Sequence, residues 1–522
     1  MSTQATEATG PSSPSLTLPP PLVKLTSEPA LLVMVFVFGA ALMLFYRPFS
    51  QLEGGDSAIY DYIAQSILRG QVPYRDVVDI KGPASVYLSA AAVALGRLVG
   101  LHDVIAIRLF HVLMVGLLAA LTFRVGVVYL RSRLIGVTAA LLPFVSPAVA
   151  EMLIGGTQPK LPLVIFGLAS LLLVAKDRPF WSGLCGMLAC LCWQPGLMFV
   201  GTAFLIFSRY LTSWRDLRAA KVVAGAVVPL AVVALYFAAR GALGDLWSYA
   251  MVYNYSVFGP EAKKPVADAG SHLWKIIRRV FDAKTLFLVV ALGGLAAYMA
   301  ERAVVKFRRG WTDELWRDAV IFPALVYLVF AFINFQAGPD LIPFLPFIGL
   351  FAAWLFAKVG EWSAALAPPR FAGVKPRLES LVSLAALAVV LALVAWPALR
   401  YRVGSETLQK QIEEVNGIAS LLQPDDAVYS HGTIGMLVLM NRANMNPYVF
   451  LDWDMDTFIA ARKYGGSFQA LIDEMEARKP KLVGMSRLRA VTHGPEFEQW
   501  LGRHYEELPL RINKGVYVRK PD

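Results

Sequence analysis

Charge is scarce in this sequence. Asp, Glu, Lys and Arg make up 17% of its 522 residues, whereas 57% are hydrophobic. A soluble globular protein of this length rarely carries so few charges. Apolar runs long enough to cross a bilayer recur along the chain, so the sequence predicts a polytopic membrane protein that is mainly α-helical.

Two further features are sparse or missing. The three cysteines, Cys185, Cys190 and Cys192, all lie in one apolar run, where they are typical of small buried hydrophobic residues. This placement argues against a disulfide framework or a cysteine metal site. The sequence also lacks the Gly-rich loops that cradle nucleotide phosphates. It indicates no required cofactor, and it neither demands nor excludes a divalent metal.

The net charge of +11 does not indicate a nucleic-acid partner, because of where the charges lie. Residues 401–522 have a balance of −1, so an excess of +12 belongs to the membrane part. Basic loops between spans follow the positive-inside rule, and three loops fit it as cytosolic: 209–221, 301–317 and 358–378.

We expect a disordered cytosolic tail at 1–28, rich in Ser, Thr and Pro, and a membrane domain over 29–400. The first apolar run lacks a cleavage site for a signal peptide and is interpreted as an uncleaved anchor. Eleven spans are predicted, or up to thirteen if the run 180–208 breaks at Trp193-Gln194-Pro195-Gly196. The predicted spans are 30–46, 84–100, 106–129, 134–150, 161–175, 180–208, 222–239, 283–300, 318–335, 341–357 and 380–398.

This parity places two loops, 47–83 and 240–282, and the segment 401–522 on the outer side of a cytoplasmic (inner) membrane, periplasmic or extracellular. The last segment has the composition of a small soluble α/β domain. Asp452, Asp454 and Asp456 alternate there, and they are interpreted as a solvated loop or a rim facing substrate, with a metal site as the less favoured alternative, because their spacing alone does not make a calcium site. The elements expected in this domain are helices at 405–422, 456–463 and 467–478 and strands at 427–430, 448–451, 481–485 and 515–519.

The loop 47–83 is dense in Asp, Arg, Tyr and Gly. From Ser57 the spacing is helical, with isoleucines on one side and polar side chains on the other: Ile59, Ile63 and Ile67 against Asp61, Gln65 and Arg69. Asp56 lies where an N-cap belongs and Gly70 where a helix should end. The pattern predicts a short amphipathic helix on the membrane surface.

Several motifs together resemble the GT-C superfamily of polyprenyl-phosphate-sugar glycosyltransferases, particularly the protein O-mannosyltransferases and the lipid A aminoarabinose transferase. The resemblance covers roughly residues 29–400. It depends on Gly54-Gly55-Asp56 with Tyr60, Pro73-Tyr74-Arg75-Asp76, Asp79-Ile80-Lys81-Gly82-Pro83, Arg108-Leu109, the break at 193–196 and the Pro-rich run 341–347. The chain departs from the family at two places, with Glu151 and Gln158 where an outer Asp is common, and with Gln336 and Asp340 in place of a cation.

The resemblance implies transfer of a sugar from a polyprenyl-phosphate donor to a lipid, glycan or protein acceptor at the outer face of the membrane. Such a reaction needs a carboxylate to take the acceptor proton. Asp56 is the first candidate, although a helix cap is the alternative role. Asp79 is the second, for catalysis or donor binding, unless it only forms a loop ion pair with Lys81; Asp76 is less favoured.

Cations should stabilise the departing phosphate. The candidates for contacts with the phosphate or substrate are Tyr60, Arg75, Lys81, Arg108, Lys263, Lys264 and His272. Outer-surface cations also meet lipid headgroups without any catalytic role. Arg108 and His111, one helical turn apart near a membrane boundary, are either functional or satisfied buried residues.

Two other function classes share these features: a transporter or flippase of lipid-linked sugars, and a non-catalytic membrane scaffold. Acidic residues are nearly absent from the predicted spans, and broken spans do not repeat in two halves, which argues against a transporter. We therefore expect a membrane glycosyltransferase.

Overall fold

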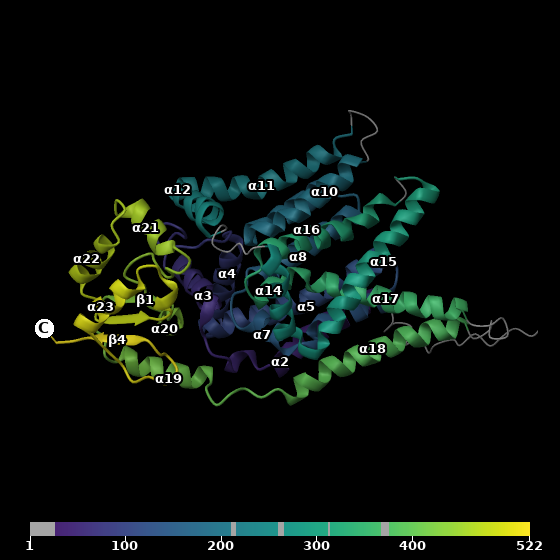
Figure 1. Cartoon of the computed structure of the whole chain (residues 1–522). Helices are drawn as coiled ribbons and strands as arrows, with labels where there is room; N and C mark the ends of the chain where they lie inside the picture. Colours follow the sequence, from purple (N-terminus) through teal and green to yellow (C-terminus); the bar gives the residue numbers. More distant parts are fainter. Residues whose placement is uncertain (1–26, 210–215, 259–265, 312–313, 367–374, 522) are drawn as a thin grey trace, which may run out of the picture.

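The computed structural model describes residues 27–209, 216–258, 266–311, 314–366 and 375–521. A bundle of helices lies beside a smaller α/β domain formed by the end of the chain (Figure 1). The bundle includes α2 (Glu28–Phe45), η1 (Pro48–Ser50), α4 (Ala84–Leu98), α5 (Asp103–Leu130), α11 (Arg218–Ala239), η5 (Asp282–Thr285), α15 (Leu286–Arg309), η6 (Leu315–Val320), α16 (Ile321–Asn334), α17 (Leu345–Leu366) and α18 (Lys375–Arg400).

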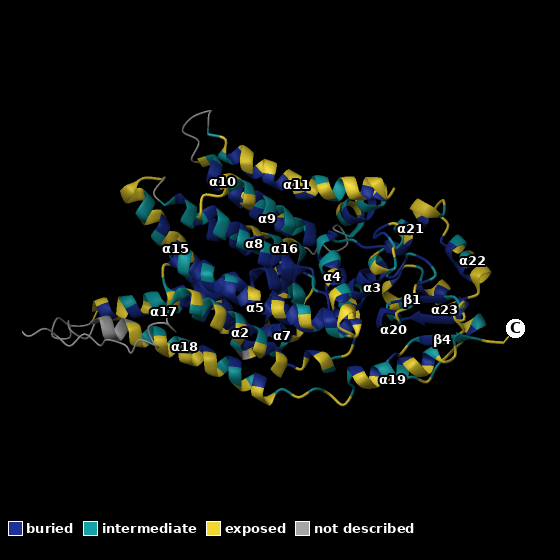
Figure 2. Ribbon diagram, turned by 180° about the vertical axis from the view of Figure 1, so that it is seen from behind, coloured by how far each residue is buried: buried dark blue, intermediate teal, exposed yellow. Residues whose placement is uncertain are grey.

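Seven helical segments among the described residues are long and apolar enough to cross a membrane, so this is a multi-pass membrane protein. Their burial differs widely. Within an 18-residue apolar stretch of each segment, 83% of the residues are buried in Gly338–Leu366, 17% in Ser380–Arg400 and 28% in Arg218–Ala239. Figure 2 shows the same contrast, with exposed residues along α11 and α18. The buried segment forms the centre of the bundle, and the other two present apolar side chains to lipid.

Two predicted spans are irregular. The run 134–150 folds as α6 (Arg133–Leu141), η2 (Leu142–Val145) and α7 (Pro147–Ile154), with a bend of 87° between the two parts. Pro143 and Pro147 lie at this bend, and each removes a backbone donor that a continuous helix needs. The run 180–208 breaks where the sequence predicted it, into α9 (Pro179–Cys192), η3 (Gln194–Gly196) and α10 (Leu197–Arg209).

The predicted helix of the first outer loop is present as α3 (Gly55–Leu68), and Gly70 follows it with a positive φ of 86°. Two expectations about this helix are wrong. The N-cap is Gly54, not Asp56, which lies inside the first turn. The polar side does not face solvent either, because Asp61 and Gln65 are fully buried. α3 is enclosed between the bundle and the C-terminal domain.

The C-terminal domain contains a four-stranded sheet in the order β1-β2-β4-β3, in which β1 and β2 are parallel and the other pairs are antiparallel. The strand expected at 448–451 is wrong, since these residues form an irregular segment. The sequence analysis missed α20, α23 and β3. The elements are α19 (Leu408–Ala419), β1 (Val428–His431), α20 (Ile434–Met440), α21 (Met455–Lys463), α22 (Gln469–Arg478), β2 (Leu482–Met485), η9 (Leu488–Ala490), α23 (Gly494–His504), β3 (Tyr505–Glu507) and β4 (Val516–Arg519).

This domain docks directly on the first outer loop. The Val78 amide donates a 2.9 Å hydrogen bond to the Pro447 carbonyl, and the Asn444 amide donates one of 2.7 Å to the Tyr62 hydroxyl. Ile63 of α3 belongs to the same hydrophobic core as Leu437 of α20. The loop and the domain therefore lie on the same side of the membrane.

The region expected from the sequence to be the second outer loop contains α12 (Leu243–Trp247), a π-helical segment η4 (Ser248–Phe258) and the amphipathic helix α14 (Val266–Phe281). Leu273, Ile276 and Ile277 of α14 are buried, whereas Arg278 and Arg279 are exposed. Wide π-helical turns often occur at functional sites, and this one borders the cavity described next.

Candidate active site

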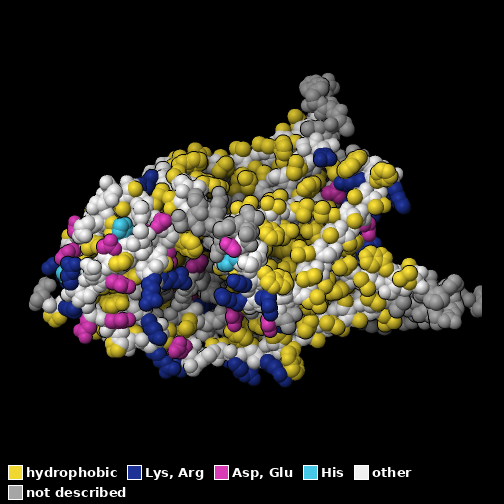
Figure 3. Space-filling view, in the orientation of Figure 1, with side chains coloured by type: hydrophobic (Ala, Val, Ile, Leu, Met, Phe, Trp, Pro, Cys, Tyr) yellow, Lys and Arg dark blue, Asp and Glu magenta, His cyan; other side chains and the backbone are white. Residues whose placement is uncertain are grey.

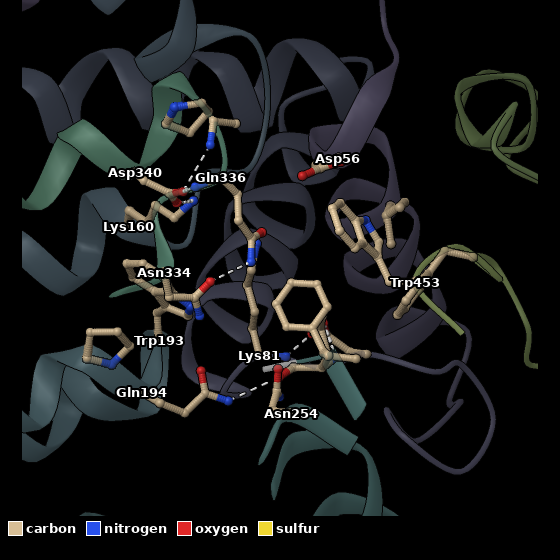
Figure 4. A pocket seen from close by; sticks show the side chains of 18 of the residues that line it. Asp56, Lys81, Lys160, Trp193, Gln194, Asn254, Asn334, Gln336, Asp340 and Trp453 are labelled. Atoms are coloured by element: carbon tan, nitrogen blue, oxygen red, sulfur yellow. Dashed lines mark hydrogen bonds and ion pairs between the residues drawn. The ribbon is translucent and has the colours of Figure 1, made fainter. Parts of the chain in front are cut away.

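A cavity of about 430 Å³ lies where the bundle meets the C-terminal domain. Figure 3 shows a hollow at this junction with Lys and Arg side chains on both sides of it. An adjoining hollow of about 210 Å³ shares Asp56, Tyr60, Lys81 and Lys160 with the cavity. These four side chains therefore lie at the centre of a two-lobed space, which is shown from close by in Figure 4.

Asp56 projects into both lobes from the first turn of α3. It is exposed, and within the described part of the chain its carboxylate has no hydrogen-bond partner. The helix N-terminus favours a negative charge at this position. Because Gly54 is the N-cap, the carboxylate is not used for capping and is available to a bound molecule.

Asp79 organises the turn that carries Lys81. Its Oδ1 accepts hydrogen bonds from the backbone amides of Ile80, at 2.7 Å, and Lys81, at 3.1 Å. Burial raises the pKa of Asp79 to about 6, against the opposing effect of these hydrogen bonds and of the Lys81 charge. The contact between Asp79 and Lys81 is made through the backbone rather than as the side-chain ion pair considered from the sequence.

Two amides fix the same turn from outside. Gln194 Nε2 donates to the Ile80 carbonyl at 3.0 Å, and Asn254 Nδ2 donates to it at 2.5 Å. Gln194 comes from the break between α9 and α10, and Asn254 comes from the π-helical segment. These two irregular segments therefore hold the turn between Asp79 and Lys81.

The Lys81 side chain is half-buried beside Tyr60. Its ammonium donates to the Tyr60 hydroxyl and lies 4.6 Å from the centre of the ring. Burial, and after it the nearby charge of Lys160, lower the pKa of Lys81 to about 8, although Asp56, Asp79 and Asp340 oppose both effects. Lys81 is thus a desolvated cation whose charge is most favourable when an anion is close.

Lys160, which the sequence analysis missed, is the second cation of the site. Its Nζ lies 2.7 Å from Asp340 Oδ1 and 4.8 Å from the centre of the Trp193 ring. It is the first residue of α8 (Lys160–Ala175), and an ionisable residue at the start of an apolar run was the available signal. Asp340 belongs to η7 (Gly338–Phe344) and accepts hydrogen bonds from two backbone amides of the preceding turn. The cation expected before the Pro-rich run is thus supplied by another helix.

The C-terminal domain completes the wall opposite Lys160. Its lining residues are Phe450, Asp452, Trp453 and Arg487. In Figure 4, Lys160 and Asp340 lie on one side of the cavity and Trp453 on the other, with Asp56 and Lys81 between them. The acidic loop interpreted from sequence as a possible substrate-facing rim does contribute to the cavity.

Arg108 and His111 do not line the cavity. Arg108 is fully buried, and its guanidinium donates to three backbone carbonyls of the first loop and to Glu53 Oε2 at 2.8 Å. His111 Nε2 accepts a 3.1 Å hydrogen bond from the Gln158 amide. Both residues are buried and hold loops that surround the site, although Arg108 Nε has no hydrogen-bond partner among the described residues.

The other candidates from the sequence lie apart from the cavity. Arg75 is exposed, binds Asp76 at 2.8 Å and donates to the Arg240 carbonyl at 2.7 Å. His272 is half-buried on α14 and is not a lining residue. Lys263 and Lys264 lie outside the described residues.

A buried carboxyl pair lies under the second lobe. Asp61 Oδ1 accepts a 2.8 Å hydrogen bond from the Thr157 amide, and Thr157 lines that lobe. Burial raises the pKa of Asp61 to about 6, and burial together with Asp61 raises the pKa of Glu53 well above its ordinary value. The helical spacing places Asp61 on the polar side of α3 but does not indicate that this side is buried, so the sequence does not reveal this pair.

Two further observations concern ligands. Among the described residues, no three His, Cys, Asp or Glu side chains are grouped as a metal site would require. An apolar hollow of about 170 Å³ lies between α14 and the helices α15 and α16. Leu341 and Phe344 also line this hollow, and they belong to the same short segment as Asp340.

Comparisons with solved structures identify the fold. No protein-family model matches the chain, and no curated protein matches its sequence. The structure of ArnT from Cupriavidus metallidurans bound to undecaprenyl phosphate superimposes with a TM-score of 0.59 at 13% identity, covering 94% of this chain and 99% of that one. The archaeal oligosaccharyltransferase AglB from Archaeoglobus fulgidus, in complex with an inhibitory peptide and a dolichol-phosphate, gives 0.51 at 12% identity, covering 95% and 74%. The chain therefore has the GT-C-like fold that the motifs of its first outer loop predicted.

Proposed function

We propose that the protein is a membrane glycosyltransferase that moves a hexose or pentose from a polyprenyl-phosphate donor to an acceptor. The observation that carries this proposal is that Asp56, a carboxylate without a partner among the described residues, and the half-buried cation Lys81 line one cavity. Two structures with the same fold contain undecaprenyl phosphate and dolichol-phosphate, which supports a lipid of this class.

In the proposed reaction, Asp56 takes the proton of an acceptor hydroxyl as its oxygen attacks the anomeric carbon of the donor sugar. A new bond forms between that carbon and the acceptor oxygen. The bond from the carbon to the phosphate oxygen breaks, and its electron pair leaves with the polyprenyl phosphate. Lys81 and Lys160 stabilise the negative charge that develops on this phosphate.

The rest of the cavity suits the donor. Trp193, Phe258 and Phe330 give the lining an apolar character on the side of the bundle. The apolar hollow under α14 continues from the segment that carries Asp340, and we propose that isoprenoid units bind there. Asp79, with its raised pKa, is proposed to position Lys81 through the backbone and is the second candidate for the base.

We further propose that the site faces the outside of the cytoplasmic membrane. The loops 301–317 and 358–378 carry excess cations and are expected in the cytosol, which leaves the cavity and the C-terminal domain on the other side. A nucleotide sugar made in the cytosol does not reach that side, so a lipid-linked donor fits this orientation.

The test is transfer by the purified protein in detergent with two kinds of donor. A synthetic decaprenyl-phosphate sugar should support transfer or slow hydrolysis, and the matching nucleotide sugar should support neither. Loss of this activity in Asp56→Asn ties it to the cavity. Turnover of the nucleotide sugar alone would refute the donor class, and retention of full activity by Asp56→Asn would refute the assigned base.

A further inference from the structure

Trp453 occupies an unusual position at the mouth of the cavity. Its side chain is 48% exposed, although a large aromatic ring normally gains stability by burial. Trp453 and Asp454 have φ values of 60° and 57°, the left-handed region that non-glycine residues rarely adopt. Such strained positions are retained where the surrounding structure enforces them, often at binding sites.

The surroundings hold this ring over the cavity. The Tyr253 hydroxyl donates a 2.7 Å hydrogen bond to the Trp453 carbonyl, and the Phe258 ring meets the indole edge to face at 5.8 Å between centres. Both residues belong to the π-helical segment η4. The strained loop of the C-terminal domain is therefore fixed by the membrane domain across the cavity.

The neighbours of Trp453 are polar and complementary to hydroxyl groups. Asp452 Oδ1 lies 3.3 Å from His431 Nε2, and its Oδ2 lies 3.9 Å from Arg487 Nη1. The Arg487 side chain is 58% exposed, so its remaining donors are free to meet a ligand in the cavity. An exposed indole suits the apolar C–H face of a sugar ring, while a carboxylate and a guanidinium suit its hydroxyls.

The arrangement of the cavity indicates whether a sugar ring bound to Trp453 belongs to the donor or to the acceptor. In a direct displacement, the incoming oxygen approaches the anomeric carbon from the side opposite to the departing phosphate. Lys81 and Lys160 define the phosphate side, and Trp453 lies across the cavity from Lys160 with Asp56 between them (Figure 4). The indole is thus on the side from which the acceptor must come.

We infer that Asp452, Trp453 and Arg487 form an acceptor subsite that binds a sugar ring, so that the acceptor is a glycan and the C-terminal domain selects it. This inference rests on the proposed function, because it assigns the second substrate of the same cavity. Trp453 provides the stacking surface, and Asp452, which lies next to His431 and Arg487, accepts hydrogen bonds from ring hydroxyls.

The experiment uses the full chain in a detergent without sugar and compares Trp453→Ala, Trp453→Tyr and the control Trp247→Ala. Trp247 is 64% exposed on α12 and does not line the cavity. Four quantities are measured: the Kd of methyl glycosides by saturation-transfer NMR, the KM of octyl glycosides as acceptors, the KM of the decaprenyl-phosphate sugar, and its hydrolysis without acceptor. A Ser/Thr peptide is assayed as an alternative acceptor.

We expect Trp453→Ala to raise the glycoside Kd and the acceptor KM about 5- to 10-fold, the loss of one aromatic contact. Its donor KM and donor hydrolysis should stay within about twofold of wild type, as expected when only the acceptor contact is removed. Trp453→Tyr should retain most of the binding because the ring is kept, and Trp247→Ala should behave as wild type.

Three results would overturn the inference. A raised donor KM with unchanged glycoside binding would place the donor sugar on Trp453. Transfer to a Ser/Thr peptide without binding of any glycoside would make the acceptor a protein. Unchanged values in Trp453→Ala would remove the subsite altogether. Failure of the proposed function is separate from these, since it appears as no turnover of the lipid-linked sugar while glycoside binding still depends on Trp453.

Discussion

Replacing Asp56 by Asn separates its chemistry from its structural contribution. The carboxylate is exposed, Gly54 is the N-cap of α3, and the described residues give Asp56 no hydrogen bond. Its only structural contribution is the charge in the first helical turn, worth about 0.3–1 kcal/mol. Loss of a general base slows a reaction about 10²–10⁴-fold, equivalent to roughly 3–5 kcal/mol in the activation barrier. The effect on rate should therefore exceed the effect on stability several-fold.

The assay measures steady-state transfer and the thermal midpoint in one detergent for Asp56→Asn, Asp56→Ala and Asp268→Asn. Asp268 is the matched control, since it is an exposed carboxylate in the first turn of α14, away from the cavity. We expect both Asp56 variants to lose activity equally while all three variants unfold at nearly the same temperature. A purely capping Asp56 would instead leave Asn active and make Ala less stable by about 1 kcal/mol. Activity above about a tenth of wild type in Asp56→Asn would refute the base assignment.

Three further predictions concern the wider structure. Lys160→Met leaves Asp340 buried without its cation and should cost about 3–5 kcal/mol of stability. Adding Asp340→Asn should restore the thermal midpoint but not the donor KM. Recovery of both quantities would show that the pair is only structural. Asp79 has a pKa of about 6 in the folded protein, above its ordinary value. Its contribution to the free energy of unfolding is therefore complete below about pH 4. Up to roughly 3 kcal/mol of it is lost as the pH rises through 6. Asp79→Asn should reduce this fall of the thermal midpoint between pH 4 and 7, and an unchanged slope would contradict the raised pKa. In a variant without native cysteines, an impermeant thiol reagent should label Ser467→Cys on intact cells but Arg308→Cys only after the membrane is opened; the opposite pattern would invert the topology.

The sequence predicted elements whose signals are local. Isoleucines at helical spacing located α3, Gly70 located its end, and Pro195 located the break that carries Gln194. The local pattern could not show which residues each face of the helix contacts. The polar side of α3 was expected to meet water, but Gln65 donates to Asp103 and to the carbonyl of Val438, which lies far along the chain.

The candidate site likewise combines residues from one local motif with residues that only the fold brings together. Asp56, Tyr60, Asp79 and Lys81 come from one continuous loop, and all four line the cavity. Lys160 was missed because its role depends on Asp340, which is 180 positions away and pairs with it only in the folded bundle. Residues 448–451 were expected to form a strand because they are apolar, but here the chain instead turns toward the cavity and places Phe450 in its lining.

The pairing of charges in the cavity indicates which cation meets the phosphate first. Lys160 already has a carboxylate partner in Asp340, so an incoming anion must compete with a buried ion pair. Lys81 donates instead to the neutral Tyr60 hydroxyl, and none of the described carboxylates forms an ion pair with it. Its pKa, lowered to about 8 by burial, shows that the folded protein alone does not compensate this charge fully. A bound phosphate would supply that compensation and favour the protonated amine. Lys81 is therefore the primary phosphate contact in the proposed site, and Lys160 with Asp340 adjusts the charge beside it.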